Sequence, residues 1–109
     1  MIDFNAMTET ALPQFNGGEG TFFAKIFNDG ATKILKGKLP CGASIGLHRH
    51  ETSCEVIFVL SGKGKAILND AEEHLTAGSC HYCPKGQSHT LINVGDEELI
   101  FYAVVPQQA

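Results

Sequence analysis

The fold is decided by residues 42–62, which read GASIGLHRHETSCEVIFVLSG. This stretch contains His48 and His50, two residues apart, and Glu55 five residues further on. On a β-strand, residues i and i+2 project from the same face, so the two imidazoles can reach one metal ion. A turn after His50 would let an antiparallel neighbour bring the Glu55 carboxylate to the same point. Taken alone, a pair of histidines on a strand is more often a surface feature or a satisfied pair.

Short apolar and β-branched runs recur on both sides of this stretch, and turn residues close each of them. Glycine is frequent, with 12 residues in 109, and the periodicity of an amphipathic helix is nearly absent. The expected strands are residues 21–27, 31–39, 43–48, 55–60, 63–68, 72–77, 79–83, 89–94 and 98–105. About nine strands, with turns every 8–12 residues or so, predict an all-β sandwich or barrel. Closing the sheet into a barrel hides its edge strands.

The chain is expected to fold as a single domain, because 109 residues suffice for one modest core but not for two. Residues 1–20 differ in texture from the rest, with one proline and three glycines, and they are expected to form an irregular N-terminal arm. Residues 21–109 are assigned to the β-domain itself.

A second patterned stretch, residues 78–93, reads GSCHYCPKGQSHTLIN. Residues 42–62 fit the pattern G-x5-H-x-H-x4-E-x6-G, and residues 78–93 fit G-x5-P-x-G-x2-H-x3-N, at every fixed position. These patterns are the two motifs of the cupin superfamily, and the chain closely resembles that superfamily. Two complete motifs in the right order make coincidence a poor explanation.

The resemblance implies a small double-stranded β-helix, or jelly-roll barrel, made of two antiparallel sheets. It also implies one divalent metal ion per chain, held inside the barrel. The ligands that it implies are His48, His50, Glu55 and His89. Three imidazoles and one carboxylate suit Mn, Fe, Ni, Co or Zn better than Ca or Mg. A six-coordinate ion would keep two positions open for a substrate or O₂, whereas a tetrahedral ion would be closed and structural.

Few acid–base groups are available to complete an active site. The candidates are Tyr82 and Tyr102, the two tyrosines of the chain, and His81, which precedes Tyr82. Tyrosines are more often core residues with a satisfied hydroxyl, and His81 could instead face a second copy of the chain. His74 follows two glutamates and is expected on a solvated surface.

Charge and cysteine content exclude several classes of protein. The formal net charge is −4 and the basic residues are scattered, so no nucleic acid is expected as a partner. Neither a long apolar run nor a basic amphipathic stretch predicts a membrane contact. The first residues lack a signal-peptide pattern, so a cytoplasmic location with four free thiols is expected. On a strand, Cys80 and Cys83 would point to opposite faces and could not share a metal ion.

Two kinds of function fit the sequence. The first is a metal-dependent enzyme that acts on a small molecule, of the dioxygenase, isomerase or lyase type found among cupins. The second is a non-catalytic module that binds a sugar or an organic acid through the metal ion. The superfamily also implies a homodimer. Aromatic residues near the N-terminus offer apolar surface for it, namely Phe4, Phe15, Phe22, Phe23 and Phe27.

Overall fold

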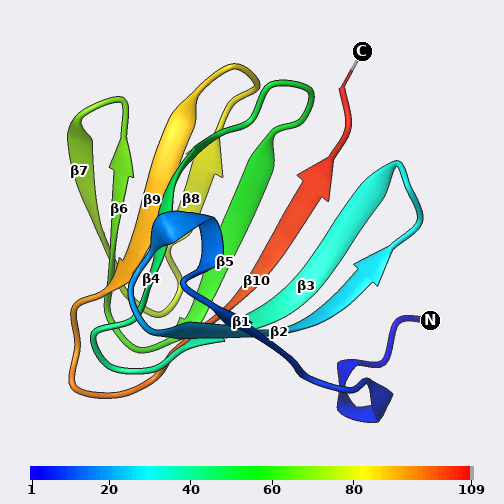
Figure 1. Ribbon diagram of the computed structural model, residues 1–109, viewed down its shortest axis with the longest axis horizontal. Coiled ribbons are helices and arrows are strands. Elements are labelled where there is room, and N and C mark those ends of the chain that lie inside the picture. Colours follow the sequence, from blue (N-terminus) through cyan, green and yellow to red (C-terminus); the bar gives the residue numbers. More distant parts are fainter. Residues whose placement is uncertain (109) are drawn as a thin grey trace.

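The computed structural model describes residues 1–108, and within them ten strands form two antiparallel sheets (Figure 1). The larger sheet has the order β1 (Thr10–Pro13), β2 (Thr21–Asn28), β3 (Thr32–Leu39), β10 (Leu99–Pro106), β5 (Glu55–Ser61), β8 (Cys80–Cys83). The smaller sheet has the order β4 (Ser44–Arg49), β9 (Ser88–Asn93), β6 (Gly64–Leu68), β7 (Ala71–Leu75). This architecture confirms the expected jelly roll, and each of the nine expected strands is found to within two residues.

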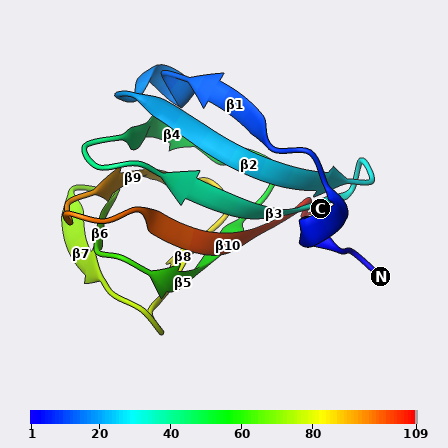
Figure 2. The same ribbon diagram turned by 90° about the horizontal axis from the view of Figure 1, so that it is seen from below.

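The N-terminal segment has more regular structure than the sequence predicts. Residues 1–20 contain β1 and two short 3-10 helices, η1 (Phe4–Ala6) and η2 (Phe15–Gly17). β1 runs antiparallel beside β2 at the rim of the larger sheet (Figure 2). Four residues ending in Pro13 give too little alternation to predict a strand, and this proline is tolerated because β1 is an edge strand. Within residues 1–108, no helix is long and apolar enough to span a membrane.

The hydrophobic core lies between the inner faces of the two sheets. Alternation along β10 is strict, with every second side chain buried, as expected for a strand with one face on the core. The rings of Phe22 and Phe101 stack with their centroids 5.9 Å apart. Gly37 makes this possible, because a Cβ at that position would overlap both rings.

The motif residues that are not metal donors have structural roles. Asn93 is buried, and its side-chain amide donates to the carbonyl oxygens of Leu39 and Glu97 at 2.8 Å each. The Asn93 side chain therefore links β9 to the end of β3 and to the loop before β10. Gly62 and Gly86 adopt positive φ angles of 90° and 86°, the region in which a side chain would be strained.

Several N-terminal aromatic rings are engaged within the chain. Phe22 is buried, Phe15 packs against it with ring centroids 5.5 Å apart, and Phe4 stacks on Tyr102 at 5.6 Å. These contacts remove part of the apolar surface that suggests a homodimer, which stays a prediction.

Candidate metal centre

Four donor side chains from both sheets meet in the interior. His48 on β4 and His89 on β9 are register partners in the smaller sheet. His50 follows β4 directly, and Glu55 is the first residue of β5 in the larger sheet. The structure thus brings together the four residues that the two sequence motifs single out.

A β-bulge in β4 decides which of its side chains face inward. Between Ile45 and His48, β4 has two residues where β9 has one. Strict alternation would put these two side chains on opposite faces, but the extra residue turns both inward. Ile45 is accordingly buried in the core, Leu47 is 67% exposed, and His48 and His50 both reach the interior cluster. The bulge therefore lets one strand supply both a core residue and the metal donors.

Gly46 lies in this bulge and has two roles. A Cβ at Gly46 would overlap the carbonyl oxygen of Asn16, so the glycine allows η2 to pack directly on β4. Its own carbonyl oxygen accepts a hydrogen bond from His48 Nδ1–H at 2.8 Å. The close approach of the N-terminal segment and the orientation of a metal donor therefore depend on the same residue.

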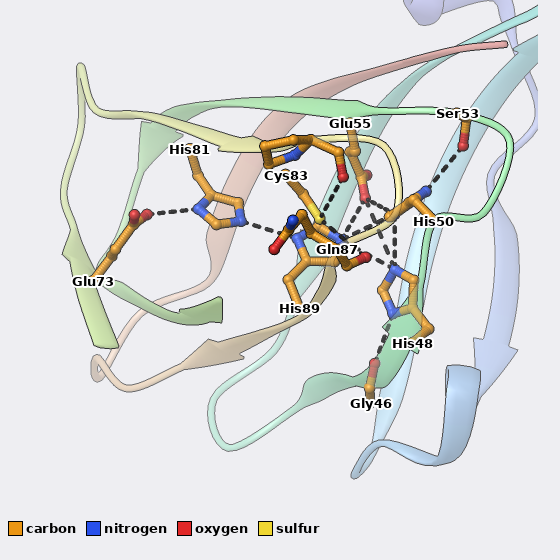
Figure 3. A network of polar contacts seen from close by, with 11 residues as sticks. Gly46, His48, His50, Ser53, Glu55, Glu73, His81, Cys83, Gln87 and His89 are labelled. Carbon is orange, nitrogen blue, oxygen red and sulfur yellow. Dashed lines mark hydrogen bonds and ion pairs between the residues drawn. The ribbon is translucent and has the colours of Figure 1, made fainter. Parts of the chain in front are cut away.

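The donor atoms of the four side chains converge on one point, all within 4.8 Å of one another (Figure 3). The Nε2 atoms of His48, His50 and His89 lie 3.0–3.2 Å from one another. Glu55 Oε1 lies 3.0 Å from His50 Nε2 and 2.9 Å from His89 Nε2. It lies 3.9 Å from His48 Nε2, which is the widest of these separations.

A divalent cation fits this arrangement. Two imidazole nitrogens can share only one proton, so three Nε2 atoms in a triangle cannot all be satisfied by hydrogen bonds to each other. A cation at the centre satisfies every lone pair at once. For metal–ligand bonds of about 2.1 Å, donors at right angles lie about 3.0 Å apart and tetrahedral donors about 3.4 Å apart. Five of the six separations, at 2.9–3.2 Å, are nearer to the first value, and the sixth, between His48 and Glu55 at 3.9 Å, exceeds both.

The protonation of the cluster follows from burial and from its own contacts. Burial by itself would raise the pKa of Glu55, but its contacts with the three histidines hold that pKa well below its usual range. Burial also lowers the pKa of His89, and the contact with Glu55 only partly offsets this effect. For His48, burial works in the same direction, but the contact with Glu55 and the hydrogen bond to the Gly46 carbonyl together outweigh it, and the pKa is raised. Glu55 is therefore an anionic donor.

A cavity of about 200 Å³ opens onto the donors. Its lining is mostly apolar and includes Phe22, Leu35 and Phe101, together with His48, His50 and Glu55. Lys33 is the one cationic side chain among the lining residues, and Asn16 is the other polar residue that is not a donor. Lys33 is near enough to His48 for its charge to act on the pKa of that imidazole. The cavity thus combines a small apolar space with one positive charge.

The structure does not bring the two tyrosines to the cluster. Tyr82 is 50% exposed on β8, and Tyr102 stacks on Phe4 on the face of β10 that alternates with the core. His81 is fully buried and contacts the donor His89, but it does not line the cavity. His74 is exposed on β7, as expected.

The sequence patterns do not single out two residues beside the site, Lys33 and Glu73. Lys33 shares its strand face with Leu35 and Leu39, so alternation along β3 could have placed it inside the barrel. Glu73 contacts His81 across the gap between β7 and β8, which belong to different sheets. No pattern in the sequence predicts that contact.

The four cysteines take no part in the donor set. All are free thiols, with Cys54 and Cys83 buried and Cys41 and Cys80 exposed. Cys80 and Cys83 point to opposite faces of β8, as their spacing predicts. Burial raises the pKa of Cys83 to about 11, so its thiol is neutral at physiological pH.

Comparison with known proteins is consistent with this geometry. Residues 36–105 match the family model of the cupin domain. The chain belongs to the cupin family. The matched region runs from β3 to β10. It includes all four residues of the candidate metal centre.

Two similar proteins come from Thermotoga maritima. An oxalate-binding protein of that organism is 30% identical over 111 residues, which cover 96% of this chain and 92% of the relative. The crystal structure of a predicted oxalate decarboxylase superposes with a TM-score of 0.92 at 27% identity, covering 98% of both chains.

More distant structures share the fold alone. A cupin-superfamily sugar phosphate isomerase from Silicibacter pomeroyi has a TM-score of 0.79 at 18% identity, covering 99% of this chain and 76% of the other. At that identity, the likeness carries no information about the reaction.

Proposed function

We propose that the protein binds oxalate, or a dicarboxylate of similar size, at a divalent metal ion held by the four donors. The single observation that carries the proposal is the cavity beside the donors, which is small, mostly apolar and lined by one cation, Lys33. The similarity to an oxalate-binding protein supports the choice of ligand.

Charge balance favours a dianion. Three neutral imidazoles, one carboxylate, a divalent ion and the Lys33 ammonium together carry two positive charges. A bound divalent ion supplies a Lewis-acid centre to which carboxylate oxygens can bind. Lys33 can then hold the second carboxylate, because it lines the same cavity as His48 and Glu55. Neutral sugars would leave this positive charge without a partner.

Cavity size favours a short ligand. Pockets for drug-sized molecules span about 300–1,000 Å³, and this cavity is smaller, at about 200 Å³. The donor separations near 3.0 Å support an ion of more than four-fold coordination, which keeps positions open for a ligand. Oxalate, with two carbons, is the shortest dicarboxylate and so suits a cavity of this size.

Binding has more support than turnover. Decarboxylation of oxalate would give carbon dioxide and formate, and the carbon that loses carbon dioxide must receive a proton. Apart from the donors, Lys33 is the only titratable side chain in the cavity lining. Tyr82 and Tyr102 point away, and both ring nitrogens of His81 are already engaged. The enzyme of oxygenase, isomerase or lyase type remains the second candidate, supported by the predicted oxalate decarboxylase that the chain resembles.

Calorimetric titration of oxalate into the Mn²⁺-reconstituted protein tests the proposal. We expect binding that disappears when the metal is removed and that weakens for succinate, which is longer, and for acetate, which has one charge. In Lys33→Met, we expect oxalate affinity to fall about 10-fold or more, since a hydrogen bond to a charged group is worth about 1.5–3 kcal/mol. Lys36→Met is the matched control, because Lys36 lies on the outer face of the same strand.

Three outcomes would contradict the proposal. Oxalate that binds equally well to metal-free protein would remove the role of the four donors. Equal affinity of Lys33→Met and wild type would remove the role of the cavity cation. Release of formate and carbon dioxide from oxalate would replace binding by turnover and favour the second candidate.

A further inference from the structure

His81 and Glu73 form a polar chain that begins at one metal donor and ends at the surface (Figure 3). His89 Nδ1 lies 2.9 Å from His81 Nε2, and His81 Nδ1 lies 2.6 Å from Glu73 Oε1. His81 is fully buried, whereas the side chain of Glu73 is 42% exposed. The imidazole of His81 therefore connects a buried donor to a carboxylate in contact with water.

The carboxylate fixes the direction of the hydrogen bond that His81 makes with it. An ionised carboxylate can only accept, so His81 Nδ1–H donates to Glu73. A His81 ring that carries a single proton, on Nδ1, has its lone pair on Nε2, where it accepts from His89 Nδ1–H. With its proton on Nδ1, His89 presents a bare Nε2 lone pair to the cluster, which is the form that a metal ion requires.

The other two histidine donors are held by weaker partners. His48 donates to a neutral backbone carbonyl, that of Gly46. His50 Nδ1 lies 3.1 Å from the hydroxyl of Ser53, which can either donate or accept and so does not fix the tautomer. Of the three rings, His89 alone has outer contacts that end at a negative charge.

The chain also fixes the plane of the His89 ring. Glu73, His81 and His89 come from β7, β8 and β9, so the contacts cross from the edge of the smaller sheet to the edge of the larger one and back. The rings of His81 and His89 are nearly parallel, with centroids 5.1 Å apart and an interplanar angle of 16°. A ring held at Nδ1 by a partner that lies nearly in its own plane has little freedom to rotate.

We propose that Glu73 and His81 are positioning residues that set the tautomer and orientation of His89 and so strengthen metal binding. The inference rests on the metal ion of the proposed function but not on oxalate as its ligand. The alternative is that His81 is a buried residue that links the two sheets and has no effect on the metal ion. That alternative predicts a loss of stability with an unchanged metal affinity.

Titration with Co²⁺ against a competing chelator, followed by visible absorption, measures affinity and ligand field together. Outer contacts of histidine ligands typically contribute about 10–100-fold in metal affinity. For His81→Phe, which keeps a ring but offers no acceptor to His89, we expect Co²⁺ affinity to fall by about 10–100-fold. We expect about 10-fold for Glu73→Gln, with shifted Co²⁺ bands in both variants. His81→Gln, whose amide oxygen can accept from His89 Nδ1–H, should recover part of the loss.

Glu72→Gln is the matched control, because Glu72 is the neighbour of Glu73 on β7 and pairs with Lys65 on the surface instead. It should bind Co²⁺ like the wild type. Histidine ¹⁵N spectra of the metal-free proteins give a second readout. Without metal, the Nδ1–H form of His89 favoured by His81 competes with the Nε2–H form favoured by Glu55 Oε1, 2.9 Å away. We expect the share of the Nε2–H form to be larger in His81→Phe and Glu73→Gln than in the wild type.

The outcomes separate this inference from the proposed function. Wild-type protein that takes up no Co²⁺ would overturn both. Wild-type protein that binds Co²⁺, with Glu73→Gln and His81→Phe binding it equally well and with unchanged bands, would overturn the positioning role alone. Should His81→Phe fail to fold, Glu73→Gln decides the matter, because the Glu73 carboxylate is partly exposed and its replacement keeps the shape of the side chain.

Discussion

The hydrophobic core and the donor cluster lie side by side in the interior, and their side chains are stabilised in different ways. Along β9, His89 and Leu91 both face inward, as do Glu55 and Ile57 along β5. In each pair, the first residue belongs to the donor cluster and the second to the hydrophobic core. The core residues stabilise the fold by removing apolar area from water. The donors are buried at a cost in desolvation, which their mutual contacts offset in part and which a bound cation would offset further.

This contrast assigns stability to one part of the interior and binding to the other. Substitutions in the core should lower the free energy of unfolding and leave the metal affinity of the folded molecules unchanged. Substitutions in the donor cluster should do the reverse. Residues shared by the two parts should change both quantities.

The largest expected effect is on metal affinity in Glu55→Gln. Apparent binding free energies of about 10–16 kcal/mol, shared among four donors, give about 3 kcal/mol per donor, or a loss on the order of 10²–10³-fold. The amide keeps the shape of the side chain, so the metal-free variant should still fold. Chelator competition measures the affinity, and Glu51→Gln, an exposed position in the same loop, is the control. An affinity that stays at the wild-type level would contradict the assignment of Glu55 as a donor.

The second prediction concerns Leu99→Ala in the core. Leu99 is fully buried, and truncation of such a leucine typically costs about 2–5 kcal/mol of unfolding free energy. Urea denaturation of the metal-free protein measures this loss. We expect chelator competition on the folded variant to give the wild-type metal affinity. A drop in affinity as large as the drop in stability would show that the two parts are not separable.

Gly46→Ala should change both quantities, because Gly46 serves both parts of the interior. The added Cβ would overlap the Asn16 carbonyl, so η2 must move away from β4. Such overpacking typically costs about 1–3 kcal/mol. Since the Gly46 carbonyl orients His48, metal affinity should fall as well. Gly95→Ala is the control, because Gly95 also lies outside the positive-φ region and its added Cβ would meet nothing closer than Lys63 Cβ at 3.3 Å.

The hydrophobic core and the donor cluster differ in how much of their structure the sequence predicts. Alternation along β3, β5, β9 and β10 predicts the core face, and the two motifs single out His48, His50, Glu55 and His89. The bulge in β4 is not visible in the pattern, yet without it Ile45 and His48 could not both face inward. Strand alternation holds only within a regular strand, and the irregularity is at the site itself.

The contacts around the donors are harder to predict, because they join segments from different sheets. His81 is recognised as a candidate from its residue type, but its partners His89 and Glu73 depend on how β7, β8 and β9 pack. Tyr82 and Tyr102 are candidates by their chemistry, but the alternation of side chains along β8 and β10 places them on outer faces. Register between strands decides these orientations, and one sequence does not determine register.

The smallest expected effect is the difference in the rate of alkylation between buried and exposed cysteine thiols. In the folded protein at pH 8, iodoacetamide should modify Cys41 and Cys80 and spare Cys54 and Cys83. Because burial raises the pKa of Cys83 to about 11, its reactive thiolate should form only at much higher pH. Mass spectrometry counts the adducts, and all four thiols should react in denaturant. Rapid modification of Cys83 at pH 8 would mean that water reaches the interior beside Glu55.

The central claim is that the interior cluster holds a metal ion, and the metal content of the purified chain tests it most directly. Elemental mass spectrometry on protein purified without chelator, then reconstituted with Mn, Fe, Co, Ni or Zn and desalted, should give about one divalent ion per chain, the number that the four converged donors can hold. Protein that retains none of these ions after reconstitution, while remaining folded, would contradict the account.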